Sequence, residues 1–318
     1  MSAELKLAPQ EVHLWQVHML APDDEILRSR SVLSQDEIQR ADRFYFENHR
    51  RRFIVAHAAM RTILSSYLNV LPPDVSFAYG PKGKPALSAD LMGSGIAFNL
   101  SHSGDYALLA VAQNFCLGVD IEFVNQEFGT EGIATRFFSA KEIETLCAMP
   151  APEKPAAFFS CWTRKEAYIK AVGDGLSIPL DSFDVAFGSG IAPCLLRVQV
   201  PGHKHWKMYD LPVPEGYKGA LVVEGKKHQL QYSIFRSAII SPRPMDLVPG
   251  RNTVVAKRWD IQEKKYHHRS EAMSPPANPP RQKLKRPRGT LQEQQPARLR
   301  RSSEHNPNKK FDWFTNRK

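Results

Sequence analysis

The sequence predicts a mixed fold in which amphipathic helices pack on antiparallel strands, followed by a basic tail without a core. Residues 11–20 alternate apolar and polar side chains, which is the two-residue period of a half-buried strand. Between 48 and 68, apolar side chains recur at helical spacing, and 42% of all residues are apolar, so a sizeable core is available. After about residue 241, proline and charged residues replace the apolar ones, and we expect disorder there.

Two helices are expected to follow the first strand. Ser34 and Glu37 have the spacing of a capping box, so one helix is predicted to start there and to continue to about residue 47. The second helix, 48–68, ends before a pair of prolines, and His57 near its apolar stripe is interpreted as a structural histidine. Its other side is basic and forms either a solvated face or an anion-binding edge: Arg50, Arg51, Arg52 and Arg61.

Two loops beside short predicted strands carry side chains suited to an anion. Lys84 lies in a Gly-Lys-Pro turn that can bring an ammonium close to a ligand, although such turns are common. Ser101, His102 and Ser103 precede a glycine at the exit of another strand. A polar binding loop and an ordinary loop with a structural histidine are about equally favoured there.

A predicted hairpin over residues 106–123 ends in two acidic side chains. Its second strand finishes at Asp120-Ile121-Glu122, and strand alternation places Asp120 and Glu122 on one face. Like charges on one face are unfavourable unless a cation or water meets them. The pair therefore marks either a cation site or a solvated strand end.

Glu166 and Lys170 lie four residues apart in a predicted helix over residues 156–172, so they share one face. Alone, they would form a surface ion pair. Together with Asp120 and Glu122, however, Glu166 completes three carboxylates on rigid elements, a hard oxygen site of the kind that Mg²⁺ takes. Lys170 would then neutralise phosphate oxygens.

The remaining elements are expected to be structural. Ser139 and Glu142 form a second capping box, and we interpret Glu142 mainly as a capping residue of the helix that follows. Strand-like segments between 183 and 235 predict an antiparallel sheet that completes the domain.

The net charge of +10 comes from the tail. Residues 245–318 contain 18 Lys and Arg against seven Asp and Glu, whereas residues 1–244 contain 25 and 26. The basic clusters in the tail could bind nucleic acid, acidic lipid or an acidic partner, or have no dedicated role. No CxxC pair, secretory signal or bilayer-length apolar run is found, which predicts a protein of the reducing cytoplasm.

Five motifs occur in the order and spacing of one enzyme family, and the chain over about residues 10–240 resembles the Sfp-type 4′-phosphopantetheinyl transferases. The motifs are Gly83-Lys84-Pro85, Phe98-Asn99-Leu100-Ser101-His102-Ser103-Gly104, Gly118-Val119-Asp120-Ile121-Glu122, Phe137-Phe138-Ser139-Ala140-Lys141-Glu142 and Trp162-Thr163-Arg164-Lys165-Glu166-Ala167-Tyr168-Ile169-Lys170. The resemblance implies an α+β fold of two similar halves related by a pseudo-two-fold axis, with coenzyme A between them. We expect an N-terminal half at 1–115 that carries the basic residues binding coenzyme A, a C-terminal half at 116–244 that carries the metal site, and a disordered basic tail at 245–318.

The resemblance also implies a reaction: transfer of the 4′-phosphopantetheine arm of coenzyme A to a serine of an acyl or peptidyl carrier protein, with release of adenosine 3′,5′-bisphosphate. We also expect a monomer. Asp120, Glu122 and Glu166 match the Mg²⁺ ligands, Lys170 matches the group that stabilises the pyrophosphate, and Glu166 or a water beside it is similar to the base. Arg40, Arg52, Lys84, Ser101 and His102 match the contacts to coenzyme A phosphates, with both arginines near the 3′-phosphate. Glu37 stands where the family often has another basic residue.

Two other functions are compatible with the same residues. A metal-dependent nucleotide or pyrophosphate hydrolase would use the three carboxylates with water in place of the carrier serine. A nucleic-acid-binding protein would act through the basic tail and would not need Asp120.

Overall fold

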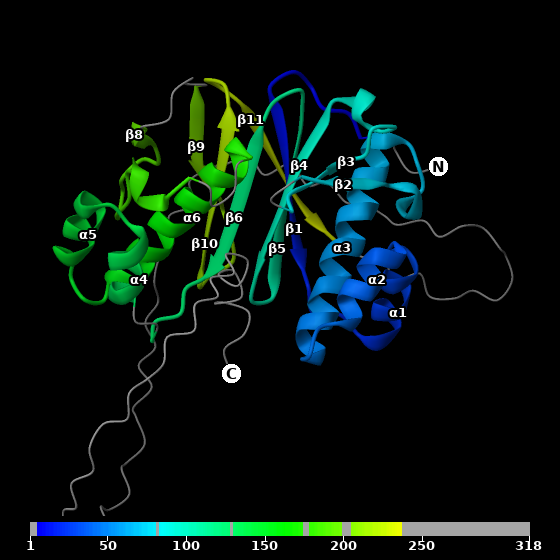
Figure 1. Ribbon diagram of the computed structural model, residues 1–318, viewed down its shortest axis with the longest axis horizontal. Helices are drawn as coiled ribbons and strands as arrows, with labels where there is room; N and C mark the ends of the chain where they lie inside the picture. Colours follow the sequence, from blue (N-terminus) through cyan, green and yellow to red (C-terminus); the bar gives the residue numbers. More distant parts are fainter. Residues whose placement is uncertain (1–4, 81–82, 128–129, 174–177, 199–204, 237–318) are drawn as a thin grey trace, which may run out of the picture. The chain divides into compact units, whose positions relative to one another are not determined.

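The computed structural model describes residues 5–80, 83–127, 130–173, 178–198 and 205–236 (Figure 1). These residues belong to one compact unit that extends over Met1–Trp259. The expected tail at 245–318 lies outside the described residues.

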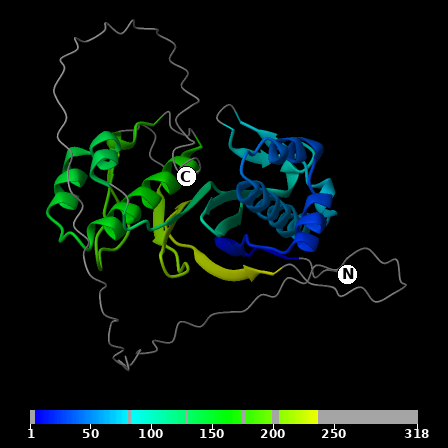
Figure 2. The ribbon, with the colours of Figure 1, turned by 90° about the horizontal axis from the view of Figure 1, so that it is seen from below.

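The N-terminal half is a four-stranded sheet covered by helices. Strands β4 (Ile96–Ser103) and β5 (Tyr106–Gln113) form an antiparallel hairpin, and β5 also pairs with β1 (Glu11–His18). At the outer edge, β11 (Gln229–Phe235) joins parallel to β1, and the two strands run side by side in Figure 2. The helices of this half are α1 (Asp23–Ser31), α2 (Gln35–Asp42) and α3 (Glu47–Leu68), and a small hairpin of β2 (Phe77–Tyr79) and β3 (Pro85–Leu87) follows them.

The C-terminal half repeats this plan with a three-stranded antiparallel sheet. Its strands are β6 (Leu117–Phe123), β10 (Tyr217–Glu224) and β9 (Trp206–Asp210), in the order β6-β10-β9. Helix α6 (Lys154–Val172) packs on β6 and β10. Helices α4 (Thr130–Phe137) and α5 (Ala140–Cys147) and the pair β7 (Phe183–Val185) and β8 (Leu195–Val198) surround α6.

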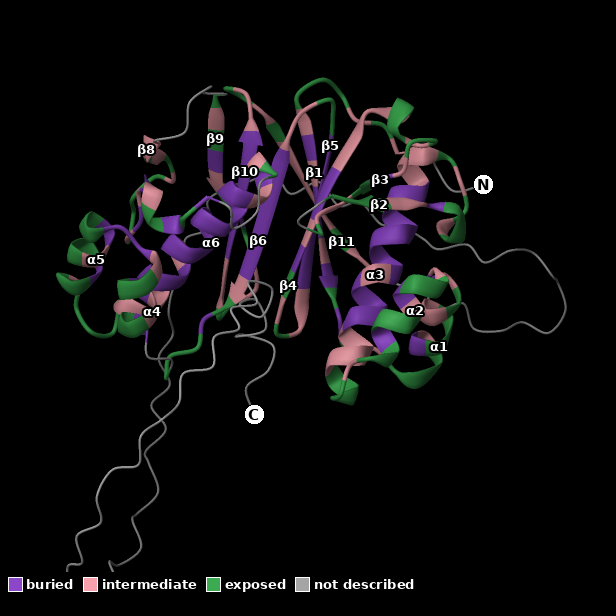
Figure 3. Ribbon diagram, in the orientation of Figure 1, coloured by how far each residue is buried: buried purple, intermediate pink, exposed green. Residues whose placement is uncertain are grey.

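A shared apolar core joins the two halves. Leu14 on β1 and Leu108 on β5 are buried in the same cluster as Val119 on β6 and Leu221 on β10. Strands β5 and β6 are accordingly buried along most of their length (Figure 3). Because the C-terminal strand β11 completes the N-terminal sheet, each half depends on the other, and the boundary at 115/116 stays a prediction.

The two halves share a buried charged motif. In the first, the capping box of Ser34 and Glu37 is present, and Glu37 Oε2 accepts a hydrogen bond of 2.6 Å from Arg61 of α3. In the second, the capping box of Ser139 and Glu142 is present, and Lys165 of α6 lies 2.8 Å from Glu142 Oε2. Arg61 and Lys165 also donate hydrogen bonds to backbone carbonyls of the segments that follow α3 and α6, respectively. The predicted α+β fold of two similar halves is thereby confirmed.

Four expectations need correction. The segments between 183 and 235 do not form one antiparallel sheet, because β11 pairs parallel with β1 and β7 pairs with β8 in a separate sheet. The helix predicted to reach residue 47 ends at Asp42, and α1 and α4 were not expected. The sequence of α1 has no apolar stripe at helical spacing, because Ile26 is the single residue of this helix that is buried. Arg61 lies on neither a solvated face nor an anion-binding edge, because it is 2% exposed and paired with Glu37. The same contact explains the acid at position 37, where a basic residue would meet Arg61 as a like charge. His57, which contacts Glu37 Oε1 at 2.8 Å, is structural as predicted.

Candidate active site

Three elements bring polar side chains together where the two halves meet. Strand alternation places Ser101 and Ser103 on one face of β4, and Asp120 and Glu122 on one face of β6. One turn of α6 separates Glu166 from Lys170. The hydrogen bonds of Asp120 with Ser101 and Lys170 show that these three faces converge.

Asp120 is the centre of this arrangement. Its Oδ1 accepts hydrogen bonds from Lys170 Nζ at 2.7 Å and from Ser101 Oγ at 2.8 Å. Lys170 Nζ also donates to Ser101 Oγ at 3.0 Å. Glu122 Oε2 accepts a hydrogen bond of 2.7 Å from Ser103 Oγ, so each serine of β4 holds one acid of β6.

The carboxylates are desolvated and repel one another. Burial and then the charge of Asp120 raise the pKa of Glu122 to about 8 and that of Glu166 to about 7. Burial disfavours the charged ammonium of Lys170, but Asp120 and Glu166 outweigh burial and raise the pKa of Lys170. A further cation at this place would therefore be stabilised by carboxylates that now repel each other.

Two carboxylate oxygens fit a divalent cation. Asp120 Oδ2 and Glu166 Oε1 are buried without a hydrogen-bond partner, which is costly for a polar atom. As the side chains stand, the described residues contain no group of three or more His, Cys, Asp or Glu that could hold a metal. The chain thus offers two unpartnered oxygens from two elements, with Glu122 beside them, and a hard cation would need further oxygens from a ligand or water.

A basic cluster lies on the N-terminal side of these acids. Burial of the imidazole, followed by the charges of His57, Lys170, Arg40 and Arg52, holds the pKa of His102 below its ordinary value. The residue keeps an exposed surface. Because Arg40, Arg52 and Lys170 carry positive charge near this ring, this part of the molecule favours an anion. Arg40, Arg52 and His102 are called the basic cluster below.

Lys84 connects the two halves. Its Nζ donates to the carbonyl of Lys170 at 2.5 Å and to that of Leu117 at 3.3 Å. The first carbonyl belongs to the last turn of α6, where a cation interacts favourably with the helix dipole.

Comparison with known proteins identifies the family. The family model described as "4'-phosphopantetheinyl transferase, N-terminal" matches residues 20–114, and that of the 4'-phosphopantetheinyl transferase superfamily matches residues 116–222. The 4'-phosphopantetheinyl transferase HetI of Nostoc sp. is 38% identical over 221 residues, which are 70% of this chain and 91% of that protein. The chain belongs to the 4′-phosphopantetheinyl transferase family. The resemblance seen in its motifs is therefore confirmed, and the protein is an enzyme of this class.

A second relative agrees with this assignment, and a solved structure is similar over a smaller part of the chain. The 4'-phosphopantetheinyl transferase Sfp of Bacillus subtilis is 33% identical to this transferase over 174 residues, which are 54% of this chain and 75% of Sfp. Among solved structures, a holo-(acyl-carrier-protein) synthase from Bacillus anthracis in complex with CoA (3',5'-ADP) has a TM-score of 0.28 and 22% identity. The match covers 34% of this chain and 94% of the synthase chain.

The structure of the transferase brings together most of the predicted site residues. Ser101, Asp120 and Lys170 are in direct contact, and the charges of Asp120 and Glu166 act on Glu122. The charges of Arg40 and Arg52 act on His102, whereas the ammonium of Lys84 lies on backbone carbonyls.

Sequence reasoning placed Ser103 in a candidate anion-binding loop, but in the structure Ser103 holds Glu122. Two further side chains near the site were not singled out from the sequence. Asp105 pairs with Arg52, and Tyr217 contacts the backbone of Asp105. No local pattern marks either of the last two residues.

Among the residues that the structure describes, no helix combines the length and apolar character needed to cross a bilayer.

Proposed function

We propose that this transferase moves the 4′-phosphopantetheine arm of coenzyme A to a serine of an acyl or peptidyl carrier protein, with Mg²⁺ as cofactor and adenosine 3′,5′-bisphosphate as the second product. The observation that carries the proposal is the pair of unpartnered oxygens, Asp120 Oδ2 and Glu166 Oε1, beside the ammonium of Lys170. Carboxylates for one cation next to a fixed positive charge are the parts that attack of a hydroxyl on phosphorus requires.

Asp120, Glu122 and Glu166 would hold the metal ion, which when bound neutralises the pyrophosphate oxygens of coenzyme A. Lys170, held in place by Ser101, binds pyrophosphate oxygen and the departing bisphosphate. Glu166, or a water beside it, accepts the proton of the carrier serine, whose oxygen bonds to phosphorus as the bond to the bisphosphate oxygen breaks. The nucleophile thus comes from the partner protein, and no serine or cysteine of this chain is needed.

Coenzyme A would bind between the halves through the basic cluster. Arg40, Arg52 and His102 are proposed to bind the 3′-phosphate region. Ser101 and Lys84 are proposed to contact the other phosphates. Because Lys84 now lies on carbonyls of Leu117 and Lys170, this role would require its ammonium to exchange partners.

The test is a mass-spectrometric assay of a panel of apo carrier proteins incubated with the enzyme, coenzyme A and Mg²⁺. A covalent phosphopantetheine adduct on the carrier serine, lost when a chelator is present, supports the proposal. Release of bisphosphate at the same rate without any carrier would instead indicate a pyrophosphate hydrolase.

We also propose that the enzyme acts as a monomer in the cytoplasm. Its four cysteines, Cys116, Cys147, Cys161 and Cys194, are free thiols, as a reducing compartment favours. Light scattering of the purified protein measures the oligomeric state, and cell fractionation measures the location.

A further inference from the structure

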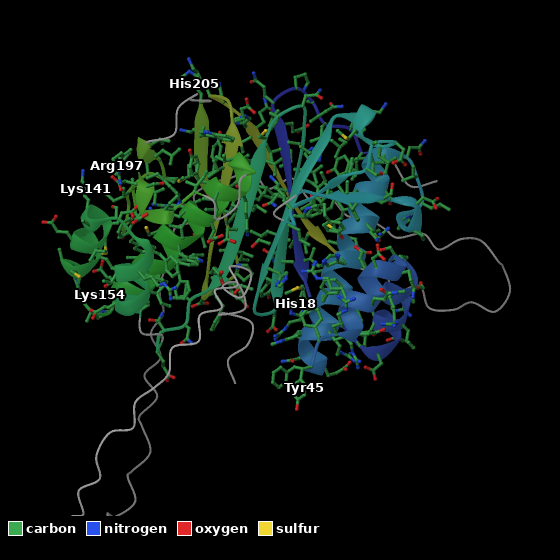
Figure 4. All side chains as sticks on the ribbon, viewed as in Figure 1. His18, Tyr45, Lys141, Lys154, Arg197 and His205 are labelled. Atoms are coloured by element: carbon green, nitrogen blue, oxygen red, sulfur yellow. The ribbon has the colours of Figure 1, made fainter. Side chains whose placement is uncertain are left out.

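The turn between β4 and β5 is held by both halves of the molecule. On its first side, Ser103 Oγ donates to Glu122 of β6 and accepts a hydrogen bond of 3.1 Å from the Phe123 N–H. On its second side, the Asp105 carbonyl accepts a hydrogen bond of 2.8 Å from the Met19 N–H, just beyond β1. His18, the last residue of β1, lies at this end of the molecule (Figure 4).

Tyr217, the first residue of β10, fixes this turn from the C-terminal half. Its hydroxyl accepts a hydrogen bond of 3.1 Å from the Asp105 N–H. The ring is held in turn by Tyr106 and Phe123, with centroid distances of 5.2 and 5.3 Å. Gly104 has φ +54°, and a Cβ there would lie 2.4 Å from the Tyr217 hydroxyl oxygen. The turn therefore has a glycine where the tyrosine approaches.

Asp105 passes this constraint to Arg52. Its Oδ1 accepts a hydrogen bond from the guanidinium of Arg52, which belongs to α3 of the N-terminal half. Arg52 Nε is buried without a partner, and the Arg52 side chain remains 27% exposed. One end of the guanidinium is thus fixed, while the side chain stays open to an anion.

We propose that Tyr217 is a positioning residue for substrate binding, because through Asp105 it orients Arg52 toward the 3′-phosphate of coenzyme A. The inference rests on the proposed function, which assigns that phosphate to the basic cluster. Its consequence is that the half carrying the metal site also sets the direction of the phosphate-binding arginine in the other half.

The test uses Tyr217→Phe, which keeps the ring and removes the hydrogen bond to Asp105. The dissociation constant for coenzyme A should rise by about threefold to tenfold, as expected for one lost hydrogen bond. The dissociation constant for 3′-dephospho-coenzyme A should stay within about twofold of the wild-type value. The kcat at saturating coenzyme A should change little. Tyr106→Phe is the matched control, since it removes a hydroxyl from the same aromatic cluster and should leave both constants unchanged.

A double-mutant cycle separates positioning from a merely structural role. In an Arg52→Gln background, Tyr217→Phe should cause no further loss of affinity for coenzyme A. The inference is overturned if Tyr217→Phe weakens the binding of both ligands equally or leaves the affinity for coenzyme A unchanged. It is also overturned if the losses of affinity caused by Tyr217→Phe and Arg52→Gln add in the double variant. Asp105→Asn, which keeps the backbone N–H and weakens the pair with Arg52, should show the same selective loss even if Tyr217→Phe does not fold.

The two proposals fail in different ways. If the wild type modifies carriers but Tyr217→Phe does not discriminate between the two ligands, only the inference is wrong. If the wild type neither modifies carriers nor binds coenzyme A, the proposed function is wrong and the inference is wrong with it.

Discussion

The unpartnered oxygens of Asp120 and Glu166 make these side chains a cost to the fold that a bound cation would offset. We therefore predict that Glu166→Gln and Asp120→Ala each reduce carrier modification at least about 100-fold, since charge stabilisation at the reacting phosphate is lost. The thermal midpoint should stay within a few degrees of the wild type. Glu144→Gln, an exposed acid on α5, is the control and should retain full activity. A variant that loses activity because it unfolds would show instead that the acid is structural.

Glu37 provides a prediction about pH. Burial disfavours its charge, but the contacts with His57, Ser34 and Arg61 lower the pKa of Glu37 to about 2, against 4.5 for a free side chain. Because burial also lowers the pKa of His57, we attribute the stabilisation at neutral pH mainly to Arg61, which stays charged. A pKa lowered by folding stabilises the protein above pH 4.5, and this contribution is lost as the pH falls toward 2.

The corresponding variant is Glu37→Gln. At pH 7 it should lower the free energy of unfolding by about 3 kcal/mol, the equivalent of the pKa difference. Urea unfolding at pH 7, 4 and 3 measures the difference between wild type and variant, which should shrink as the pH falls. A difference that is the same at all three values would contradict the role of the charge. Asp36→Asn, one residue earlier and exposed, is the control.

Helix α6 and strand β6 approach so closely that only glycine fits between them. A Cβ on Gly118 would lie 2.2 Å from the Ala167 carbonyl oxygen and 2.3 Å from the Ala171 nitrogen, which are backbone atoms of α6. We predict that Gly118→Ala displaces Glu166 and Lys170 from Asp120, lowers kcat more than the affinity for coenzyme A and costs about 1–3 kcal/mol of stability. Kinetics and thermal unfolding measure both effects. Gly132→Ala on α4, where nothing lies within 4 Å, should be neutral or slightly stabilising. Unchanged kcat in Gly118→Ala would show that the site tolerates a shift of α6.

The elements also show what sequence can predict. The capping boxes of α2 and α5 are local patterns within four residues, and strand or helix periodicity fixes which of Asp120, Glu122, Glu166 and Lys170 share a face. The convergence of β6 and α6 follows from the family resemblance, since no local pattern brings them together. Tyr217 could not be predicted, because its partner is a backbone N–H that any residue carries. Helix α1 was missed since it buries a single apolar residue.

In the whole molecule, the site belongs to neither half alone. The N-terminal half provides Ser101 and the basic cluster, and the C-terminal half provides the carboxylates and Lys170. The shared core of the two sheets and the pairing of β11 with β1 fix this arrangement. We therefore expect activity to depend on how the two halves are held together, and this is the physical reason for proposing that Tyr217 affects binding in the other half.

The excess charge of the chain comes from residues 245–318. The family matches end at residue 222, and residues 245–318 carry 18 basic against seven acidic side chains. We predict that removal of residues 245–318 leaves kcat/KM for a carrier protein within about twofold. Carrier modification measures this property. Loss of transfer in the truncated protein would show that the tail takes part in carrier recognition.

The same truncation should abolish any binding to nucleic acid that weakens steeply with salt, because such binding depends on basic side chains. A salt titration of binding to duplex DNA measures it. Asp120→Ala in the full chain is the control, since it should lose carrier modification and keep any DNA binding. Salt-dependent DNA binding that survives truncation would place the nucleic-acid site in residues 1–244, where basic and acidic side chains nearly balance.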